Sequence, residues 1–313
     1  MGTQAIAVRT PRVRRAVTER ARLTRGRSGI WFTLPFLLAY AAFLVWPLVL
    51  GVKMSLSNDS LSGTAGGFVG LRNFGEALTD AAVWQSLWHT AWFTILSTPP
   101  LVVLGLVMAL LANHLTPARW LWRLAYFAPF LLPVAVVSLL WTWLFQPGFG
   151  LFDGMLSWLG VHLNIGWLTD PDAAMPAIVL TTLWWTVGFN FLLYLAALQT
   201  IPPDLYEASA LDGAGWWRQL RHVTLPMLRR TTVLIVVLQL LASLKVFDQI
   251  YLMTQGGPNH ATRPVIQYVY EASFTGYRTG YGTAISYVFF ALILVVTVSQ
   301  LRLFRARDEE TTP

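Results

Sequence analysis

The side chains that could do covalent or metal chemistry are few in this chain. Its 313 residues include no cysteine, so no disulfide, zinc–thiolate cluster or thiol nucleophile can form. Its two lysines, Lys53 and Lys245, stand outside any G-x-x-x-x-G-K-[ST] phosphate loop, so the chain cannot hold ATP in such a loop. We therefore expect no catalytic residue, no metal site and no cofactor bound by this chain.

A second group of chemically capable residues lies within long apolar segments. Asn190, Gln239 and Ser243 can donate and accept hydrogen bonds, while Lys245 and Asp248 carry charge. An unpaired lysine at the centre of a membrane costs about 2.5 to 3.5 kcal/mol. Because Lys245 and Asp248 are three residues apart, one continuous helix would let them form an ion pair. On such a helix Gln239 and Ser243 share one face, and the charged pair lies roughly opposite.

The elements that must position these residues are membrane helices. The chain is 55% apolar and only 12% charged, so lipid must be its main solvent. A hydrophobic run of about 20 residues spans the hydrocarbon core, and the chain has six such runs. The predicted fold is an all-α integral membrane protein whose spans cover residues 30–52, 86–112, 122–145, 173–200, 231–254 and 282–301.

Basic residues predict how these helices are oriented. The tail 1–29 carries eight arginines and one acid, and the run after it is too long for a signal peptide, so we interpret that run as a retained first span. With both termini inside, the cytoplasmic segments hold 17 basic residues against four in the outer loops 53–85, 146–172 and 255–281. The predicted domains are a basic tail 1–29, a transmembrane domain 30–302 and a cytoplasmic tail 303–313. Since the +7 net charge lies in tails and loops, no nucleic-acid partner is expected.

The cytoplasmic loop 201–228 predicts two short helices under the membrane. Pro202 and Pro203 can open the first helix, and Gly213 can end it in a left-handed conformation. A second helix fits residues 216–223, where Trp216, Leu220 and Val223 share one face.

This loop also resembles the EAA motif of permease subunits in binding-protein-dependent ABC importers. The matching residues are Glu207, Ala208, Ser209, Gly213 and the segment 223–226. Ser209 replaces the commoner alanine, and no proline follows Arg229. The resemblance implies a coupling helix that docks on a separate ATPase, with the contact carried by Glu207, Ala208, Ser209, Asp212 and Gly213.

A second resemblance points to the maltose-transporter type of first permease in carbohydrate importers. It rests on residues 247–251, 254–258, 261–262 and 268–270, and on the early segments 34–35, 46–47 and 68–74. It implies a type I importer permease in a bacterial inner membrane. The implied partners are a second homologous permease, an ATPase dimer that binds ATP and magnesium, an extracytoplasmic substrate-binding protein, and lipid.

The same resemblance implies that the fifth span lines the sugar site. We therefore assign Gln239 and Ser243 to the translocation path, with Asn190 as a further candidate that could instead bond between helices. We assign Lys245 and Asp248 to a structural ion pair. The competing interpretation makes Lys245 a direct ligand for an anionic substrate such as a polyol phosphate.

Two other classes of protein fit parts of the sequence. A membrane-embedded enzyme would use histidines as ligands or bases, but these are scattered over both sides, at His89, His114, His162, His222 and His260. An ion-coupled carrier would need carboxylates inside its spans, where only Asp248 is found. Co-purification of an ATPase would argue against both classes.

Overall fold

The computed structural model describes residues 28–62, 66–114, 119–158, 160 and 165–309. These residues belong to two units, one that ends at Lys53 and one that begins at Met54. The tail 1–27, the end 310–313 and His162 lie outside the described residues. The described residues are helical apart from their connections, with a single isolated bridge between Ser57 and Phe68, so the predicted all-α class is confirmed.

The first unit is built on one long apolar helix. It consists of α2 (Ser28–Tyr40), a π-helical turn at Ala41–Val45, and α3 (Trp46–Ser55), whose last residues enter the second unit. Residues Phe32–Ser55 are long and apolar enough to cross a membrane, in agreement with the first predicted span. Pro35 lies inside this helix, near its start.

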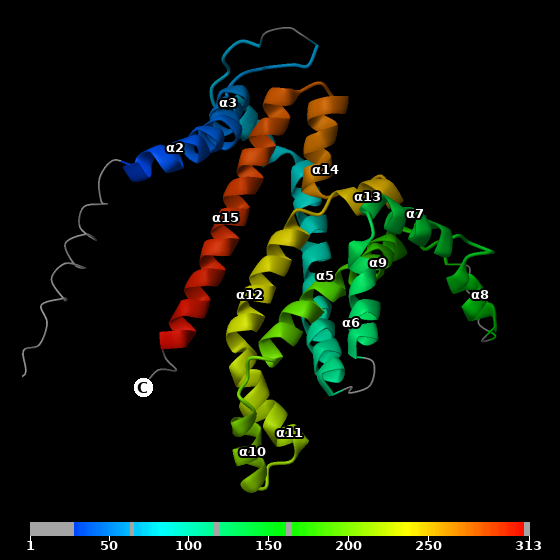
Figure 1. Ribbon diagram of the computed structural model, residues 1–313. Coiled ribbons are helices and arrows are strands. Elements are labelled where there is room, and N and C mark those ends of the chain that lie inside the picture. The colour runs from blue at the N-terminus through cyan, green and yellow to red at the C-terminus, as the bar shows by residue number, and fades with distance from the viewer. Residues whose placement is uncertain (1–27, 63–65, 115–118, 159, 161–164, 310–313) are drawn as a thin grey trace, which may run out of the picture. The chain divides into compact units, whose positions relative to one another are not determined.

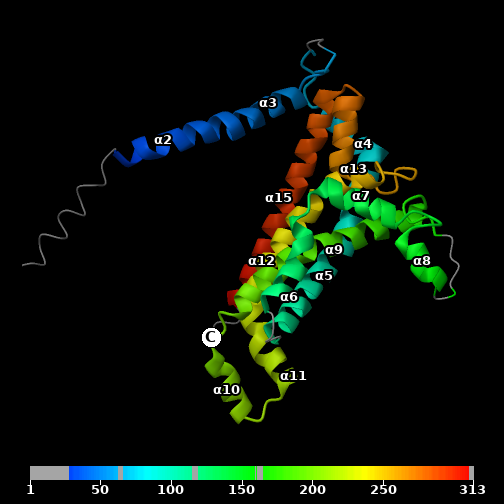
Figure 2. The ribbon, with the colours of Figure 1, turned by 45° about the vertical axis from the view of Figure 1, so that its right-hand side comes forward.

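The second unit is a bundle of long helices (Figure 1). Its most extensive helix pair is α5 (Ala81–His114) against α9 (Pro171–Leu198), and α12 (Leu225–Leu244) packs against both. The last helix, α15 (Thr279–Glu309), runs from the candidate span into the segment that we predicted as the C-terminal tail. Figures 1 and 2 place α10 (Pro203–Leu211) and α11 (Trp216–Gln219) at one end of the bundle and α14 (Val265–Tyr270) at the other.

The third predicted span is broken. It consists of α6 (Arg119–Phe127), a 3-10 turn at Ala128–Leu131, and α7 (Val134–Leu144), with a bend of 95° between the two halves. The cause is local, because Leu132 before Pro133 adopts the extended conformation that proline imposes on its predecessor. Among the described residues, five helices pass as membrane spans, and this bent pair makes a sixth if counted as one span.

The fifth predicted span also differs from expectation. Helix α11, a π-helical turn at Leu220–Thr224 and α12 form one continuous helix, Trp216–Leu244, which is long and apolar enough to cross a membrane, so the second loop helix is continuous with the predicted span. The run stops at Leu244, and α13 (Asp248–Met253) starts after a three-residue break. The predicted span 231–254 therefore begins within this helix and crosses a break that the sequence pattern did not indicate.

Short helices complete the end of the bundle opposite α10. They include α4 (Arg72–Thr79), which packs on α15, and α14, which packs on α5 and α15. A π-helical turn at Glu271–Thr275 follows α14, and α8 (Leu151–Trp158) follows α7.

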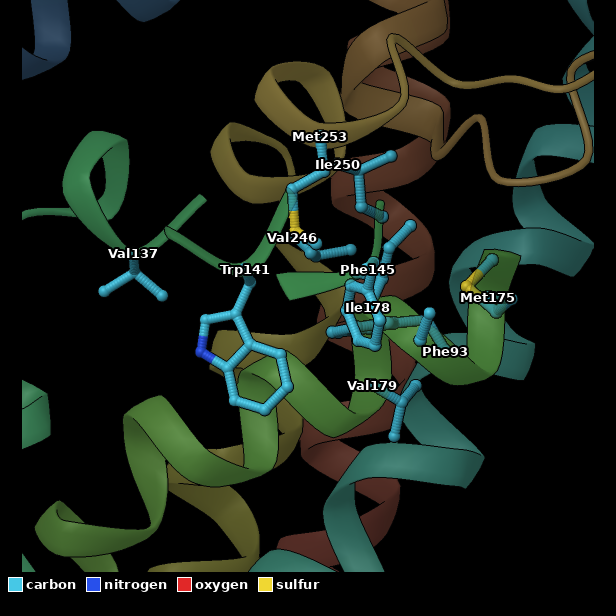
Figure 3. Close-up of a cluster of buried hydrophobic side chains, with 11 residues drawn as sticks. Phe93, Val137, Trp141, Phe145, Met175, Ile178, Val179, Val246, Ile250 and Met253 are labelled. Carbon is cyan, nitrogen blue, oxygen red and sulfur yellow. The ribbon is translucent and has the colours of Figure 1, made fainter. Parts of the chain in front are cut away.

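Apolar clusters hold the helices together around the break. Phe93 of α5, Trp141 of α7, Ile178 of α9 and Ile250 of α13 belong to one buried cluster, which Figure 3 shows converging from all four helices. Between membrane helices such contacts stabilise the bundle through close van der Waals packing rather than through transfer from water. The break after α12 is therefore embedded in a packed environment rather than left as a loose loop.

Candidate functional site

The coupling-loop helix α10 begins and ends as its residues predict. Pro202 and Pro203 stand at its start. At its end, Gly213 has φ +75°, the Ala214 N–H donates to the Ser209 carbonyl, and the Gly213 N–H donates to the Ala210 carbonyl. This pair of bonds is a Schellman motif, which requires a left-handed residue at the position of the glycine.

The residues assigned to the ATPase contact lie mostly on the exposed side of this loop. Glu207, Ala208, Asp212 and Gly213 are exposed. Ser209 is half-buried, because its hydroxyl faces the rest of the loop and donates to the Tyr206 carbonyl. The loop thus offers a free outer face, with one member of the motif turned inward.

A cavity of about 300 Å³ opens where α12 ends. Gln239 and Ser243, the residues predicted for the translocation path, both contribute to its wall. Its other polar residues include Thr182, Thr186 and Gln249. Five aromatic side chains complete much of the lining: Phe93, Phe130, Trp185, Phe189 and Phe247.

Lys245 and Asp248 differ from their predicted placement. They do not share a helix, since Lys245 caps the end of α12 and Asp248 begins α13. Both are exposed, both line the same cavity as Gln239, and no ion pair joins them within the described part of the chain. The assumption of one unbroken helix placed them on the opposite face, and the break at residues 245–247 removes that assumption.

Asn190 lies beside the cavity wall without lining it. Its Nδ2 is 3.3 Å from Oε1 of Gln239 and 3.3 Å from the Leu101 carbonyl oxygen, so it connects α9 to α12 and α5. Gly105 permits this approach, because a Cβ there would lie 2.8 Å from that of Asn190. Of the two roles considered for Asn190, this geometry favours the interhelical bond.

The remaining hydroxyl groups around the cavity are partly satisfied within the protein. Ser243 donates to the Leu240 carbonyl and lies 3.4 Å from the Thr98 hydroxyl. Gln249 donates its amide to Thr182 at 3.3 Å. Within the described residues no hydrogen bond is found for the Gln239 NH₂, the Gln249 carbonyl oxygen or the charged groups of Lys245 and Asp248, so these groups and the aromatic rings remain for a ligand.

The aromatic lining did not follow from the sequence pattern. Trp185 and Phe189 are four residues apart on α9, and the Trp185 indole N–H donates to the Leu132 carbonyl at the bend between α6 and α7. Aromatic residues at helical spacing are common in membrane helices, so spacing alone did not separate them from lipid-facing residues. The available signal was that Trp185 and Phe189 alternate with the polar residues Thr182, Thr186 and Asn190 along the same helix.

A second polar cluster lies at the end of the bundle opposite α10. Asp80 accepts hydrogen bonds from the hydroxyls of Tyr268, at 2.5 Å, and Tyr281, at 2.6 Å. Partial burial acts to raise the pKa of Asp80, but these bonds, the Ala82 N–H and nearby Arg263 together hold that pKa below its usual value. The carboxylate therefore joins α5 to α14 and α15.

Metal-binding groups are not found in the part of the chain that the structure describes. No three histidine, aspartate or glutamate side chains gather there in a way that could hold an ion. The histidine candidates separate: His89 contacts the Arg263 carbonyl near one end of the bundle, and His222 contacts the Arg218 carbonyl near the other.

Comparison with known proteins agrees with this arrangement. A permease protein of the sulfoquinovosyl glycerol transport system of Agrobacterium fabrum is 35% identical over 275 residues, covering 88% of this chain and 89% of that protein. The permease protein MalF of the trehalose/maltose transport system of Thermococcus litoralis is 33% identical, covering 94% of this chain and 99% of that protein.

The fold also has a solved counterpart. A chain in the crystal structure of a bacterial ABC transporter involved in importing the acidic polysaccharide alginate superposes with a TM-score of 0.79, at 24% identity, covering 93% of this chain and 100% of that chain. At that identity the likeness supports the fold. The family model described as binding-protein-dependent transport system inner membrane component matches residues 101–308, and the chain belongs to this family of ABC importer permeases.

Proposed function

We propose that this chain forms one half of the path by which a binding-protein-dependent importer carries a sugar or a related polyol. The observation that supports this substrate class is the cavity at the end of α12, which is lined by five aromatic rings and by the amide of Gln239. Sugars offer apolar C–H faces and many hydroxyls, which suit aromatic platforms and a few placed polar groups. The named substrates of the two permease relatives are also glycosides.

The energy for transport comes from a separate ATPase in this proposal. The exposed face of α10, with Glu207 and Ala208, is the surface that would dock on that ATPase. The ATPase dimer binds ATP and magnesium, a second homologous permease completes the path, and an extracytoplasmic binding protein delivers the sugar. Both termini of this chain lie in the cytoplasm, as the bias of basic residues favours.

The experiment is to purify the assembled complex and identify the molecule held by its binding protein by mass spectrometry. A sugar or polyol, together with an ATPase in stoichiometric amount, is the expected result. An amino acid or a metal chelate on the binding protein would contradict the substrate class. A chain that transports without any ATPase would contradict the mechanism.

A further inference from the structure

Two polar ties connect the coupling helix α10 to the start of the helix that lines the cavity. In the first, the Gln219 Nε2 lies 3.1 Å from the Ser209 hydroxyl and 3.2 Å from the Tyr206 carbonyl oxygen. In the second, the Tyr206 hydroxyl lies 3.0 Å from that of Thr224. Tyr206, Ser209 and Gln219 are half-buried and Thr224 is buried, so water competes only in part for these bonds.

These hydrogen bonds link the two segments that lie on either side of the chain reversal at Gly213. The Schellman motif at Gly213 turns the backbone from α10 into α11, and the side-chain bonds then close the reversal from 10 and 18 residues away. The side chain of Ser209 matters here, because it supplies an acceptor at the position where the family motif more often has alanine. An alanine at this position would leave Gln219 with the Tyr206 carbonyl alone.

The tied helix continues to the cavity. Residues Trp216–Leu244 form a run of 29 residues, about 43 Å long at 1.5 Å per residue. Gln219 and Thr224 lie near its first end, while Gln239 and Ser243 lie near its other end, at the cavity. A displacement of α10 can therefore reach the cavity through a single helix, provided that α10 does not hinge at the reversal.

We infer that Gln219 and Tyr206 are positioning residues that make α10 and α12 move as one rigid body, with Ser209 as the acceptor that completes the tie. This inference rests on the proposed function, since it assumes that α10 docks on an ATPase. It adds the route by which docking is transmitted, which differs from the docking face itself. The exposed residues contact the partner, and the inward-facing residues prevent the loop from bending.

A distance measurement tests rigidity directly, and this chain contributes no native cysteine to the labelling. Spin labels on Ala210→Cys, exposed on α10, and Leu234→Cys, exposed on α12, report the distance between the two helices by pulsed electron paramagnetic resonance. The sample is the full complex, reconstituted in lipid, without nucleotide and after trapping with ATP and vanadate. We expect one narrow distance that is the same in both states.

The variants remove the ties one at a time. Gln219→Glu keeps the side-chain volume but loses the donor, and Tyr206→Phe loses only the hydroxyl. Loss of one hydrogen bond favours bent conformations by roughly five-fold, the equivalent of about 1 kcal/mol. In both variants we expect a broader distance that shifts on trapping, and fewer molecules transported per ATP. Gln199→Ala is the matched control, because this exposed glutamine at the end of α9 has no side-chain bond within the described residues.

Two outcomes would overturn the inference. A distance that changes between states in the unsubstituted complex overturns the rigid body, as does a distribution in both variants equal to that of Gln199→Ala. Should Gln219→Glu fail to assemble, Tyr206→Phe alone decides between these results. Retention of the ATPase by the chain is measured in the same preparations: its absence contradicts the proposed function, whereas retention with a hinged loop contradicts only the rigid body.

Discussion

Single residues around the cavity show how an amide is oriented for a ligand. Asn190 donates to Oε1 of Gln239, and the Gln239 NH₂ has no partner among the described residues, so it can donate to a ligand in the cavity that Gln239 lines. Gln239 is itself only 8% exposed, so it cannot reorient without losing this bond. The cavity therefore presents a donor at this point, suited to a hydroxyl or ring oxygen of a sugar.

Replacing the two polar residues Gln239 and Ser243 of the cavity wall should abolish transport without lowering the yield of the complex. Gln239→Leu with Ser243→Leu removes the donor and the hydroxyl but keeps the helix apolar, so insertion should not suffer. We expect uptake of the sugar identified on the binding protein to fall by at least about ten-fold from loss of the Gln239 donor alone, worth about 1.5 kcal/mol, and further because Ser243→Leu fills part of the cavity. Uptake in whole cells, normalised to complex yield, measures this. Leu234→Met, exposed on the same helix, is the control, and near-normal uptake by the double variant would contradict our assignment of the path.

The carboxylate of Asp80 should contribute stability that depends on pH. Its pKa lies below the usual value, so the ionised form is favoured by folding, and the contribution is complete above about pH 4 and lost as the pH falls through the depressed pKa. Asp80→Asn should lower the free energy of unfolding at pH 7 by about 1.5 to 3 kcal/mol, the range for hydrogen bonds to a charged group. Thermal unfolding in detergent at pH 7 and at pH 3 measures the difference, which should shrink at the lower pH. An equal difference at both values would contradict the ionised cluster.

At the scale of elements, the coupling loop combines an exposed helix with a glycine that few other residues can replace. Gly213 has φ +75°, and a Cβ added to it would meet no atom within 4 Å, so a side chain would fit in space but not in conformation. A β-branched residue in this region costs about 1 to 3 kcal/mol. The backbone of the loop therefore depends on this glycine, and Glu207 is the exposed carboxylate that we predict to contact the ATPase.

Both features can be tested through uptake. Glu207→Ala removes a carboxylate able to pair with a basic group on the ATPase, and Gly213→Val strains the reversal. Each should lower uptake by about ten-fold or more while insertion stays normal, in line with the loss of roughly 1.5 kcal/mol or more. ATP hydrolysis stimulated by the binding protein is measured alongside. Full transport with normal stimulation in both variants would mean that the loop merely connects two spans.

The break between α12 and α13 changes what a charge exchange is expected to do. On one continuous helix, Lys245→Asp with Asp248→Lys would preserve an ion pair and much of the uptake. Because both side chains line the cavity and no ion pair joins them in the described residues, the exchange instead moves charge within the site. We expect uptake to fall by about ten-fold or more, with an unchanged yield of complex. Uptake close to that of the parent protein would instead support the interpretation of Lys245 and Asp248 as a structural ion pair.

At the scale of the whole molecule, orientation in the membrane remains a prediction from charge. Cysteines introduced at Ser62 and Ser28 should react with an impermeant maleimide from outside and from inside respectively, because basic residues are retained in the cytoplasm. The parent chain has no cysteine and serves as the blank. Labelling of Ser28→Cys in intact cells would contradict the predicted orientation.

The sequence by itself determined the class of protein and the local geometry of the coupling loop. Hydrophobic length is a property of the chain alone, so the helices that can cross a membrane follow from it. The left-handed end of α10 follows from Gly213, since few other residues accept that conformation. Resemblance in the same loop identified the family, which the matched residues 101–308 confirm.

Only the tertiary structure decided which residues share the cavity. A helical wheel assumes an unbroken helix, and it placed Lys245 and Asp248 opposite Gln239 because nothing local marks a break at residues 245–247. The break is held by packing: Val246 and Ile250 belong to a buried cluster with Phe93 of α5 and Ile178 of α9. Contacts between segments far apart in the chain favour that conformation over the continuous helix, and a periodic pattern within one segment carries no information about them.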